Sequence, residues 1–393
     1  MVYKSEENRI PVADSLRGFA IIAIALLHSI NHYNLYQFPE QTIPFLQWTD
    51  RFIETIIRAI SSGKAYGIFA ILFGFTFYIQ LSRQAIQGKD FKYRFIWRMF
   101  LLFLIGNINS LFFAWEILIL YSIIGLILVA LRHTKYRILM AIILVFMLQP
   151  LILTKIVYIL VDQNYVQNFE KYLPNDLYHQ LTENSFFEMI KANLTTGKKL
   201  YWMSILSNGE RVFQTGAFFI IGMLIGRKGL FEHSAYSDKF WKNSFIGFLT
   251  AFIVLKWVMF LVKAYVMTGP LQNMTEYLLT TWSDFSVVIM IIAIFMKIYS
   301  NPIKLKLKWA EQLGKMSLTN YLAQSILGSF LFYGYGLSLS KYCGVTASLF
   351  VGIFILFLQY YFCTWWLKQH VKGPMEQLWH NLTWMNFKKV HFD

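Results

Sequence analysis

Charged residues and cysteines are scarce in this sequence. Only 15% of the 393 residues are Asp, Glu, Lys or Arg, whereas 56% are hydrophobic. Soluble domains average about 25% charged residues, so the composition excludes an ordinary water-soluble fold. The two cysteines, Cys343 and Cys363, are too few for a disulfide framework. With no CxxC motif or His/Cys cluster around them, they predict no metal site.

Several nucleotide-binding and catalytic motifs are also missing. The chain has no glycine-rich phosphate loop and no GxSxG elbow, which argues against P-loop and serine-hydrolase chemistry. Its formal net charge of +15 would suit nucleic acid, but Lys and Arg are concentrated in the short connections between apolar runs, as the positive-inside rule describes. We therefore expect a lipid bilayer as partner and no nucleic acid.

Long apolar runs recur from one end of the chain to the other. Windows of about 20 apolar residues are long enough to cross the hydrocarbon core as helices. The sequence therefore predicts an all-α, polytopic helical bundle that forms one membrane domain over residues 1–393. The ten expected spans are 12–33, 63–82, 95–113, 115–131, 137–161, 211–227, 244–266, 282–299, 315–337 and 344–367.

The connections between these spans predict a topology. Connections rich in Lys and Arg alternate with mixed or nearly neutral ones, which places both termini in the cytoplasm and the spans in the cell membrane. No small-residue cleavage site follows the first apolar run, so we expect no cleavable signal peptide. Residues 40–60 predict an amphipathic helix at the outer interface, 162–210 an extracytoplasmic cap, and 368–393 a cytoplasmic amphipathic tail.

The first span carries ionisable side chains at both ends. Arg17 and His28 are 11 residues apart, which on an α-helix brings them within roughly 20° of one another and about 16 Å apart along the axis. Asp14, Asn31 and His32 fall close to the same line. Such a polar stripe must face protein or water rather than lipid, and an imidazole has a pKa suited to proton transfer near neutrality.

The ninth expected span has a polar face of its own. Ser317, Asn320, Tyr321 and Gln324 recur at intervals of three and four residues, so they share one side of a helix. We expect that side to line the same cavity as the polar stripe of the first span. Further ionisable groups within the spans or at their ends are Glu116, Glu210, Arg211, Lys256 and Asp284.

Each of these side chains also has a purely structural interpretation. Asp14 and Arg17 are spaced to pair on one helical turn, and Arg17 is near enough to the cytoplasmic end to extend its charge into water. His28 and His32 would then be packing histidines with hydrogen-bonding partners. The polar face of the ninth span would link helices to one another. The sequence leaves both interpretations open.

Several segments resemble one family of bacterial membrane proteins. These segments are GKMSLTNYLAQS (Gly314–Ser325), FYGYGL (Phe332–Leu337), KGPMEQLW (Lys372–Trp379), RIPVADSLRGFA (Arg9–Ala20) and FQTGAFFIIGMLIGR (Phe213–Arg227). They are similar to the pattern of the YeiB-like family, domain of unknown function 418, and the resemblance covers most of the chain. That family is distantly similar to transmembrane acyltransferases.

The resemblance to acyltransferases implies a chemical layout. A cytoplasmic acyl-CoA, such as acetyl-CoA, would place its phosphates near Asp14, Arg17 and the basic loops. His28, with His32 beside it in the catalytic group, would deprotonate an acceptor hydroxyl or amine as general base. Polar groups such as Asn31, Asn320 or Gln324 would stabilise the oxyanion, and the polar face of the ninth span would line the substrate cavity. We therefore expect acyl transfer to an extracytoplasmic glycan, lipid or small-molecule acceptor, with no metal.

Two other classes of function fit the same sequence. A transporter or channel for a small polar or anionic solute would use the polar stripe to line its pathway, although the sequence shows no inverted repeat and no pair of Gly/Pro-broken spans. A membrane protein without catalysis, as a monomer or a homo-oligomer, is the third class. Specific binding of acyl-CoA would favour the enzyme, and solute flux without any donor would favour the transporter.

Overall fold

The computed structural model describes residues 10–32, 38–39, 43–162, 175–182, 185–266, 269–300 and 307–385. Within these residues the protein is helical and has no strand, which confirms the all-helical prediction. The α-helices are α1 (Pro11–Leu27), α2 (Pro44–Ser61), α3 (Lys64–Ile86), α4 (Lys92–Asn109), α5 (Ile117–Ile124), α6 (Leu126–Leu131), α7 (Tyr136–Met147), α8 (Pro150–Val161), α9 (Asn175–Thr182), α10 (Phe186–Ala192), α11 (Lys198–Asn208), α12 (Glu210–Arg227), α13 (Ala235–Tyr265), α14 (Pro270–Ser300), α15 (Lys308–Lys315), α16 (Ser317–Phe332), α17 (Val345–Trp366) and α18 (Pro374–Trp384). Three short turns of other helical types are η2 (His28–His32), η3 (Asn193–Gly197) and η4 (Leu339–Lys341).

Five helical segments of the described chain are long and apolar enough to cross a membrane. They are α1 with the turn that follows it, α2 with α3, α13, α14 and α17, and the bent pair α7 and α8 would make a sixth. These segments indicate a membrane protein. The predicted count of ten spans exceeds what helix length and apolar character show.

One of the expected spans is bent. The 115–131 window forms α5 and α6, which join at Gly125 with the backbone still helical (φ −55°, ψ −26°). The 137–161 window bends by 43° between α7 and α8, where Gln149 has a φ of 55° and Pro150 starts the second helix. Proline lacks the N–H that would continue the first helix, so the backbone turns at this point.

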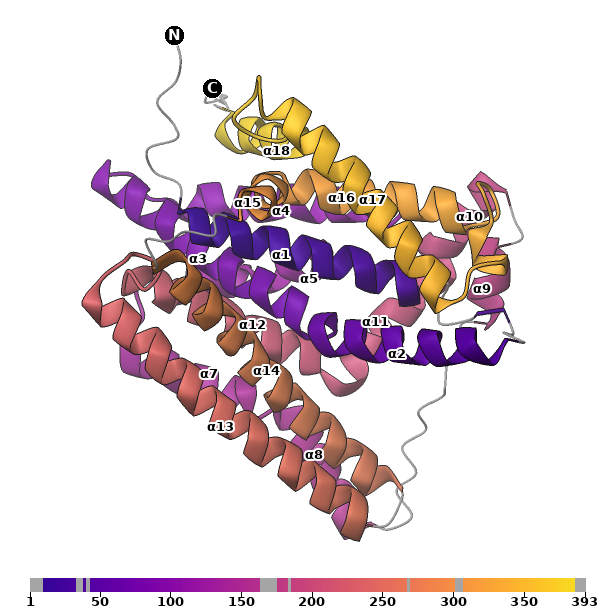
Figure 1. Ribbon diagram of the computed structural model, residues 1–393. Coiled ribbons are helices and arrows are strands. Elements are labelled where there is room, and N and C mark those ends of the chain that lie inside the picture. Colours follow the sequence, from indigo (N-terminus) through magenta and orange to yellow (C-terminus); the bar gives the residue numbers. More distant parts are fainter. Residues whose placement is uncertain are drawn as a thin grey trace, which may run out of the picture.

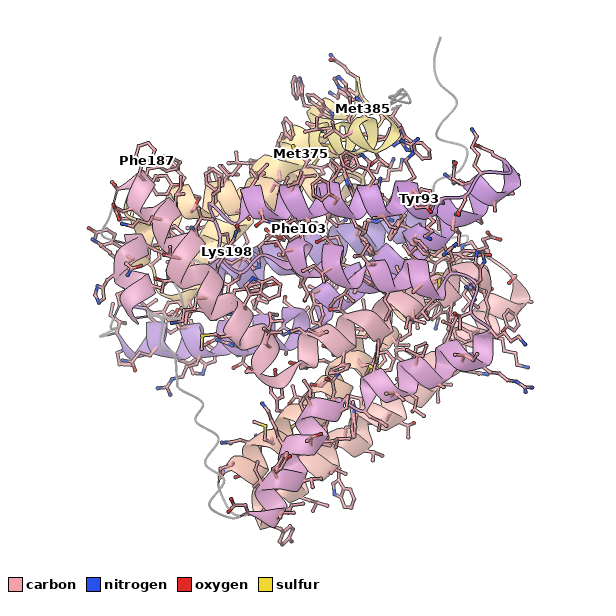
Figure 2. All side chains as sticks on the ribbon, turned by 180° about the vertical axis from the view of Figure 1, so that it is seen from behind. Tyr93, Phe103, Phe187, Lys198, Met375 and Met385 are labelled. Atoms are coloured by element: carbon pink, nitrogen blue, oxygen red, sulfur yellow. The ribbon has the colours of Figure 1, made fainter. Side chains whose placement is uncertain are left out.

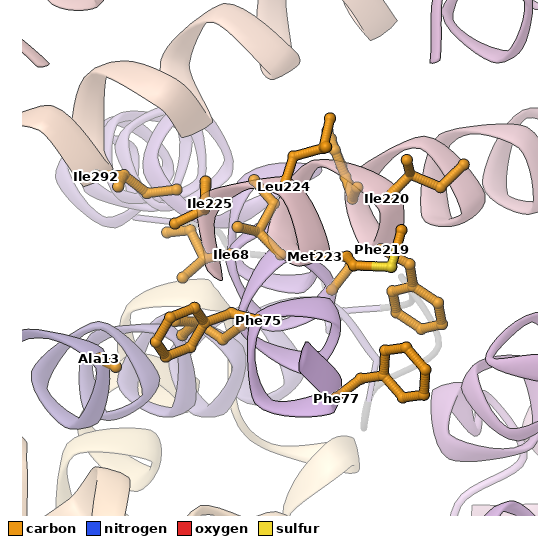
Figure 3. Close-up of a cluster of buried hydrophobic side chains, with 14 of the residues drawn as sticks. Ala13, Ile68, Phe75, Phe77, Phe219, Ile220, Met223, Leu224, Ile225 and Ile292 are labelled. Carbon is orange, nitrogen blue, oxygen red and sulfur yellow. The ribbon is translucent and has the colours of Figure 1, made fainter. Parts of the chain in front are cut away.

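Helix α3 crosses α12 at very short range. A Cβ on Gly74 would overlap the carbonyl oxygen of Phe219, and a Cβ on Gly222 would overlap that of Ile71. Around this crossing lies the main hydrophobic core, with contributions from α1, α3, α12 and α14 (Figure 3). The two glycines therefore set the spacing of the helices that build the core.

A second close crossing joins α1 to α15, two helices nearly 300 residues apart in the chain. A Cβ on Gly18 would overlap the carbonyl oxygen of Ala310, and a Cβ on Gly314 would overlap that of Asp14. The polar N-terminal part of α1 is thereby held against the segment that leads into α16. This crossing positions the candidate site described below.

Helix α1 runs through the centre of the molecule, while α13 and α14 lie together along one edge (Figure 1). No residue in the most apolar window of α13 is buried, so this face is available to lipid. Lys256, on α13, lies over the ring of Phe252 at 5.4 Å, a cation–π contact. The amphipathic helix expected over 40–60 forms as α2, with Phe45 and Trp48 exposed.

The segment expected to form a cap contains α9, α10 and α11. Figure 2 shows Phe187 and Lys198 of this segment at the opposite end of the molecule from Tyr93, near the start of α4. Lys198 donates a hydrogen bond of 2.9 Å to the side-chain oxygen of Asn107, near the end of α4. The cap is thus attached to the helical bundle at one end.

Candidate functional site

A cavity of about 610 Å³ lies among α1, α3, α4, α5, α15, α16 and α18. Its size is within the range of small-molecule and cofactor sites, about 300–1,000 Å³. One part, the basic end, is lined by Arg17, Arg83, Arg98, Lys315 and Lys372. The other part, the tyrosine end, is lined by Tyr66, Tyr121 and Tyr321. Apolar side chains such as Ile24 and Phe73 line the walls.

Arg17 is fixed in the basic end by two partners. Its guanidinium donates to the carboxylate of Asp14 at 2.6 Å, one helical turn earlier, and to the hydroxyl of Thr76 on α3 at 2.7 Å. The pairing predicted from the three-residue spacing is therefore present. Arg17 nevertheless lines the cavity, so the structural and functional interpretations do not exclude each other.

Arg98 has a different environment. Its guanidinium stacks on the ring of Trp379 of α18 at 3.5 Å, and no carboxylate in the described part of the chain lies within ion-pair distance of it. Electrostatic repulsion acts between Arg98 and Arg17, which both line the cavity. Two cations that face one partly enclosed space favour an anionic ligand between them.

Helix α18 is attached to the rest of the wall through Glu376. Its carboxylate accepts from the backbone N–H of Leu318 at 2.6 Å and of Thr319 at 3.2 Å, and from the Thr319 hydroxyl at 2.5 Å. These N–H groups belong to the first turn of α16, where a helix lacks internal acceptors. Burial raises the pKa of Glu376, while these hydrogen bonds act in the opposite direction.

The other side of α18 contacts α4. The indole of Trp97 donates to the Leu382 carbonyl at 3.0 Å, and that of Trp379 donates to the Arg98 carbonyl at 3.2 Å. Figure 2 shows Met375 and Met385 at the two ends of this helix. His380 also lines the cavity, and its pKa falls to about 4 because it is half-buried and close to the cations Lys372 and Arg98. The predicted amphipathic tail thus covers the basic end of the cavity.

The tyrosine end is backed by a buried carboxylate. The Tyr321 hydroxyl donates to Glu116 at 3.2 Å, and Glu116 is 0% exposed. Glu116 also caps α5 by accepting from the N–H of Leu118 at 2.7 Å, and it accepts from the amide of Asn109. The Tyr121 hydroxyl donates to the Tyr66 carbonyl at 2.6 Å, so the three tyrosines are held by neighbouring elements.

Four of the residues predicted for the site line this cavity. Asp14 and Arg17 come from α1, and Ser317 and Tyr321 come from α16. They converge because the α1–α15 crossing brings the start of α16 against the first helix. Residues of the expected first and ninth spans thus line the same cavity.

The histidine predicted as general base does not line this cavity. The lining reaches Ile24 on α1, and His28, one turn further on, is 8% exposed. Its ring centroid lies 4.8 Å from that of Phe113 and 6.5 Å from that of Tyr321. The Tyr321 ring thus contacts both the cavity and His28. The side chain of His32 lies outside the described residues.

The other predicted residues serve as links between helices. Asn31 accepts a hydrogen bond of 2.9 Å from Arg58 of α2. Asn320 donates to the Leu313 carbonyl at 3.0 Å, and Gln324 donates to the side chain of Gln359 on α17 at 3.1 Å. Asn320 and Gln324 do not line the 610 Å³ cavity, because the polar face of α16 is divided between the cavity and α17.

Another group of charged side chains meets behind Tyr66. The ammonium of Lys64 lies 2.5 Å from the carboxylate of Asp284 on α14, and the guanidinium of Arg211 lies 4.2 Å from the centre of the Tyr66 ring. Glu210 accepts from the hydroxyls of two α14 residues. The sequence marked three of these charges as ionisable groups in spans but gave no indication that they converge.

The comparisons with known proteins support the resemblance drawn from the sequence motifs. Residues 225–386 match the family model described as "Protein of unknown function (DUF418)". This part of the chain is therefore similar to the DUF418 family. The matched region contains α16 and α18, which form one wall of the cavity.

Two curated relatives align with the chain over nearly their whole length. "Uncharacterized protein YxaH" of Bacillus subtilis (strain 168) is 23% identical, with 98% of this chain and 96% of the relative covered. "Uncharacterized 39.9 kDa protein in amylase 3'region" of Bacillus acidopullulyticus is 24% identical, with 96% and 94% covered. No solved structure matches the chain.

Proposed function

We propose that this protein is a membrane acyltransferase that takes an acyl group from acyl-CoA and passes it to a glycan, lipid or small-molecule acceptor across the membrane. The proposal depends on the polarity of the cavity, which changes from a basic end through apolar walls to the tyrosine end. Acyl-CoA has matching parts in the same order, namely anionic phosphates, a pantetheine arm and a thioester carbonyl.

The proposal uses ten spans in a bacterial cytoplasmic membrane, with both termini in the cytoplasm. The shorter helices α4 and α12, with the pairs α5–α6 and α15–α16, would supply the four spans beyond the six that length and apolar character support. In this topology the basic end faces the cytoplasm, where acyl-CoA is made. The acceptor would approach from the side of the cap.

The phosphates of the donor would bind between Arg17 and Arg98. Charge-assisted hydrogen bonds to arginine are the strong ones in proteins, and guanidinium matches phosphate geometry. From Arg17 to Ile24 the α1 axis rises about 10 Å, so the pantetheine arm would run along the apolar walls toward Tyr321. Hydroxyl groups there would hydrogen-bond the thioester carbonyl as negative charge develops on it.

Binding of acetyl-CoA to the purified protein in lipid nanodiscs tests this proposal. We expect saturable binding that CoA competes for and that weakens as salt is raised. Arg17→Gln and Arg98→Gln should each weaken binding about tenfold or more. Arg137→Gln is the matched control, because this exposed arginine belongs to a basic connection but does not line the cavity. Equal affinities for the wild type and both cavity variants would refute the proposed donor site.

One observation favours a transporter as the second candidate. The bend at Gln149 between α7 and α8 supplies an interrupted helix pair, and interrupted helices are common in transporters. Proteoliposomes to which labelled acetyl-CoA is added from outside distinguish the two functions. An acyltransferase leaves CoA outside while the acetyl group reaches an acceptor inside, whereas a transporter carries the whole labelled solute inward.

A further inference from the structure

The Glu116–Tyr321 pair stands at the inner end of the cavity. Tyr321 lines the cavity and donates to Glu116. Glu116 has no exposed surface and accepts from three groups, the Tyr321 hydroxyl, the Asn109 amide and the Leu118 N–H. The carboxylate is therefore well ordered. Of these three partners Leu118 and Tyr321 line the cavity, and Tyr321 is the one that joins Glu116 through a side-chain hydroxyl.

A buried carboxylate is costly for a membrane protein to maintain. Capping of α5 needs only an acceptor for the Leu118 N–H, and Ser, Thr or Asn would supply one without an ionisable group. An acid buried within a membrane protein marks a functional site by default. At this position a carboxyl group can exchange a proton with the cavity through a single hydroxyl.

We propose that Tyr321 and Glu116 form the proton relay of acyl transfer, an inference that rests on the proposed function above. Tyr321 is the catalytic residue, because its side chain faces the cavity. Glu116 is the positioning residue that orients the hydroxyl and holds the proton. The substrates of this site are a thioester and an acceptor that bears a hydroxyl group.

Acyl transfer exchanges one bond for another and moves one proton. The acceptor oxygen bonds to the thioester carbonyl carbon, and the carbon–sulfur bond breaks. The acceptor proton passes to the Tyr321 oxygen as the Tyr321 proton passes to Glu116. The reverse transfer then delivers a proton to the departing thiolate. Both residues end in their starting states, and the products are an ester and a free thiol.

His28 is placed less well for this step. It contacts the Tyr321 ring and Phe113, but the cavity lining ends before it. A base must come within hydrogen-bond reach of the proton that it removes, either directly or through one water molecule. The relay thus assigns the proton transfer to a pair that borders the cavity, with His28 packed behind it.

The test measures release of free CoA from acetyl-CoA with a thiol reagent, with glycerol or glucose as hydroxyl-bearing probes. Tyr321→Phe and Glu116→Gln should lower the rate about 100-fold, with the dissociation constant of acetyl-CoA changed less than about threefold. Glu116→Asp should restore part of the rate. Tyr335→Phe is the matched control, because its hydroxyl bonds to Ser329 of α16 away from the cavity.

The pH profile separates a relay from a structural role. The pH–rate profile of the wild type should contain a sloping limb that is caused by ionisation of the Tyr321–Glu116 pair. The profile of Glu116→Gln should lack that limb. The relay is overturned if Tyr321→Phe keeps the wild-type rate, if Glu116→Gln keeps the wild-type pH profile, or if His28→Asn alone abolishes the rate. Failure of the wild type to bind acetyl-CoA would overturn the proposed function itself. Binding without any CoA release would overturn both.

Discussion

The hydroxyl of Tyr321 donates a hydrogen bond of 3.2 Å to Glu116, a residue 205 positions earlier in the chain. The bond joins α16 to the start of α5, and both helices line the cavity. Because Glu116 also caps α5, this contact ties the position of Tyr321 to the end of a helix. The inner end of the cavity therefore depends on the fold as well as on its own side chains.

Stability measurements should detect this bond. Tyr321→Phe removes one of three donors to Glu116, so we expect a loss of about 1–2 kcal/mol in the free energy of unfolding. A double-mutant cycle with Glu116→Gln, followed by thermal unfolding in detergent, should give a coupling of about 1 kcal/mol. Strictly additive losses would show that the two side chains do not interact.

The sequence predicted most helices, because apolar runs and their flanking charges are local signals. The single span expected over 137–161 did not include the bend at Gln149, although Pro150 is a local signal that a helix ends. The tail was expected at a membrane surface. Its attachment to α16 through Glu376 depends on a contact between residues 57 or 58 positions apart, which no pattern of spacing reveals.

The candidate site likewise has features that the sequence predicted and features that it did not. Arg17 and Asp14 are linked by spacing along one helix, and the structure pairs them. The helical periodicity also placed His28 near the line of Arg17, but Phe113 and Tyr321 occupy the space in front of its ring. Arg98 has the appearance of an ordinary flanking cation, and only the tertiary structure brings it into the cavity.

The two glycines where α1 crosses α15 should not tolerate replacement by a residue with a side chain. We expect Gly18→Ala and Gly314→Ala each to destabilise the protein by about 1–3 kcal/mol or more, because the added Cβ would meet backbone, which cannot move aside as a side chain does. Gly247→Ala, on α13, is the control, since nothing lies within 4 Å of its Cβ position. Monodispersity after purification and the midpoint of thermal unfolding are the measurements. Equal midpoints for all three variants would contradict the close crossing.

The effects of replacing Lys64 and Asp284 on the free energy of unfolding should be strongly coupled. Both side chains are nearly buried, and their charged atoms lie 2.5 Å apart. Asp284→Asn leaves a buried ammonium without its counter-ion, which costs about 3–5 kcal/mol. Lys64→Met combined with Asp284→Leu should be less destabilising than Asp284→Asn, because no buried charge is left uncompensated. A double variant at least as unstable as the single one in thermal unfolding would refute this account.

The attachment of α18 should depend on pH through Glu376. Burial raises the pKa of this carboxyl, so folding favours the protonated form. The stabilisation is then fully present below the ordinary glutamate pKa, about 4.3, and is lost as the pH rises through the higher pKa of the folded protein. We expect the thermal midpoint of the wild type to fall over this window and that of Glu376→Gln to fall less.

Titration of His380 changes the stability of the protein in the opposite direction. The effect of Glu376 is therefore measured in variants that lack His380. Its pKa is lowered to about 4, so the stabilisation from its neutral ring is present above the ordinary histidine pKa, about 6.5, and is lost as the pH falls through about 4. Comparing His380→Gln with the double variant that adds Glu376→Gln isolates the carboxyl. Identical pH slopes for these two proteins would show that Glu376 titrates alike in the folded and unfolded states, and that its contact with α16 does not sense pH.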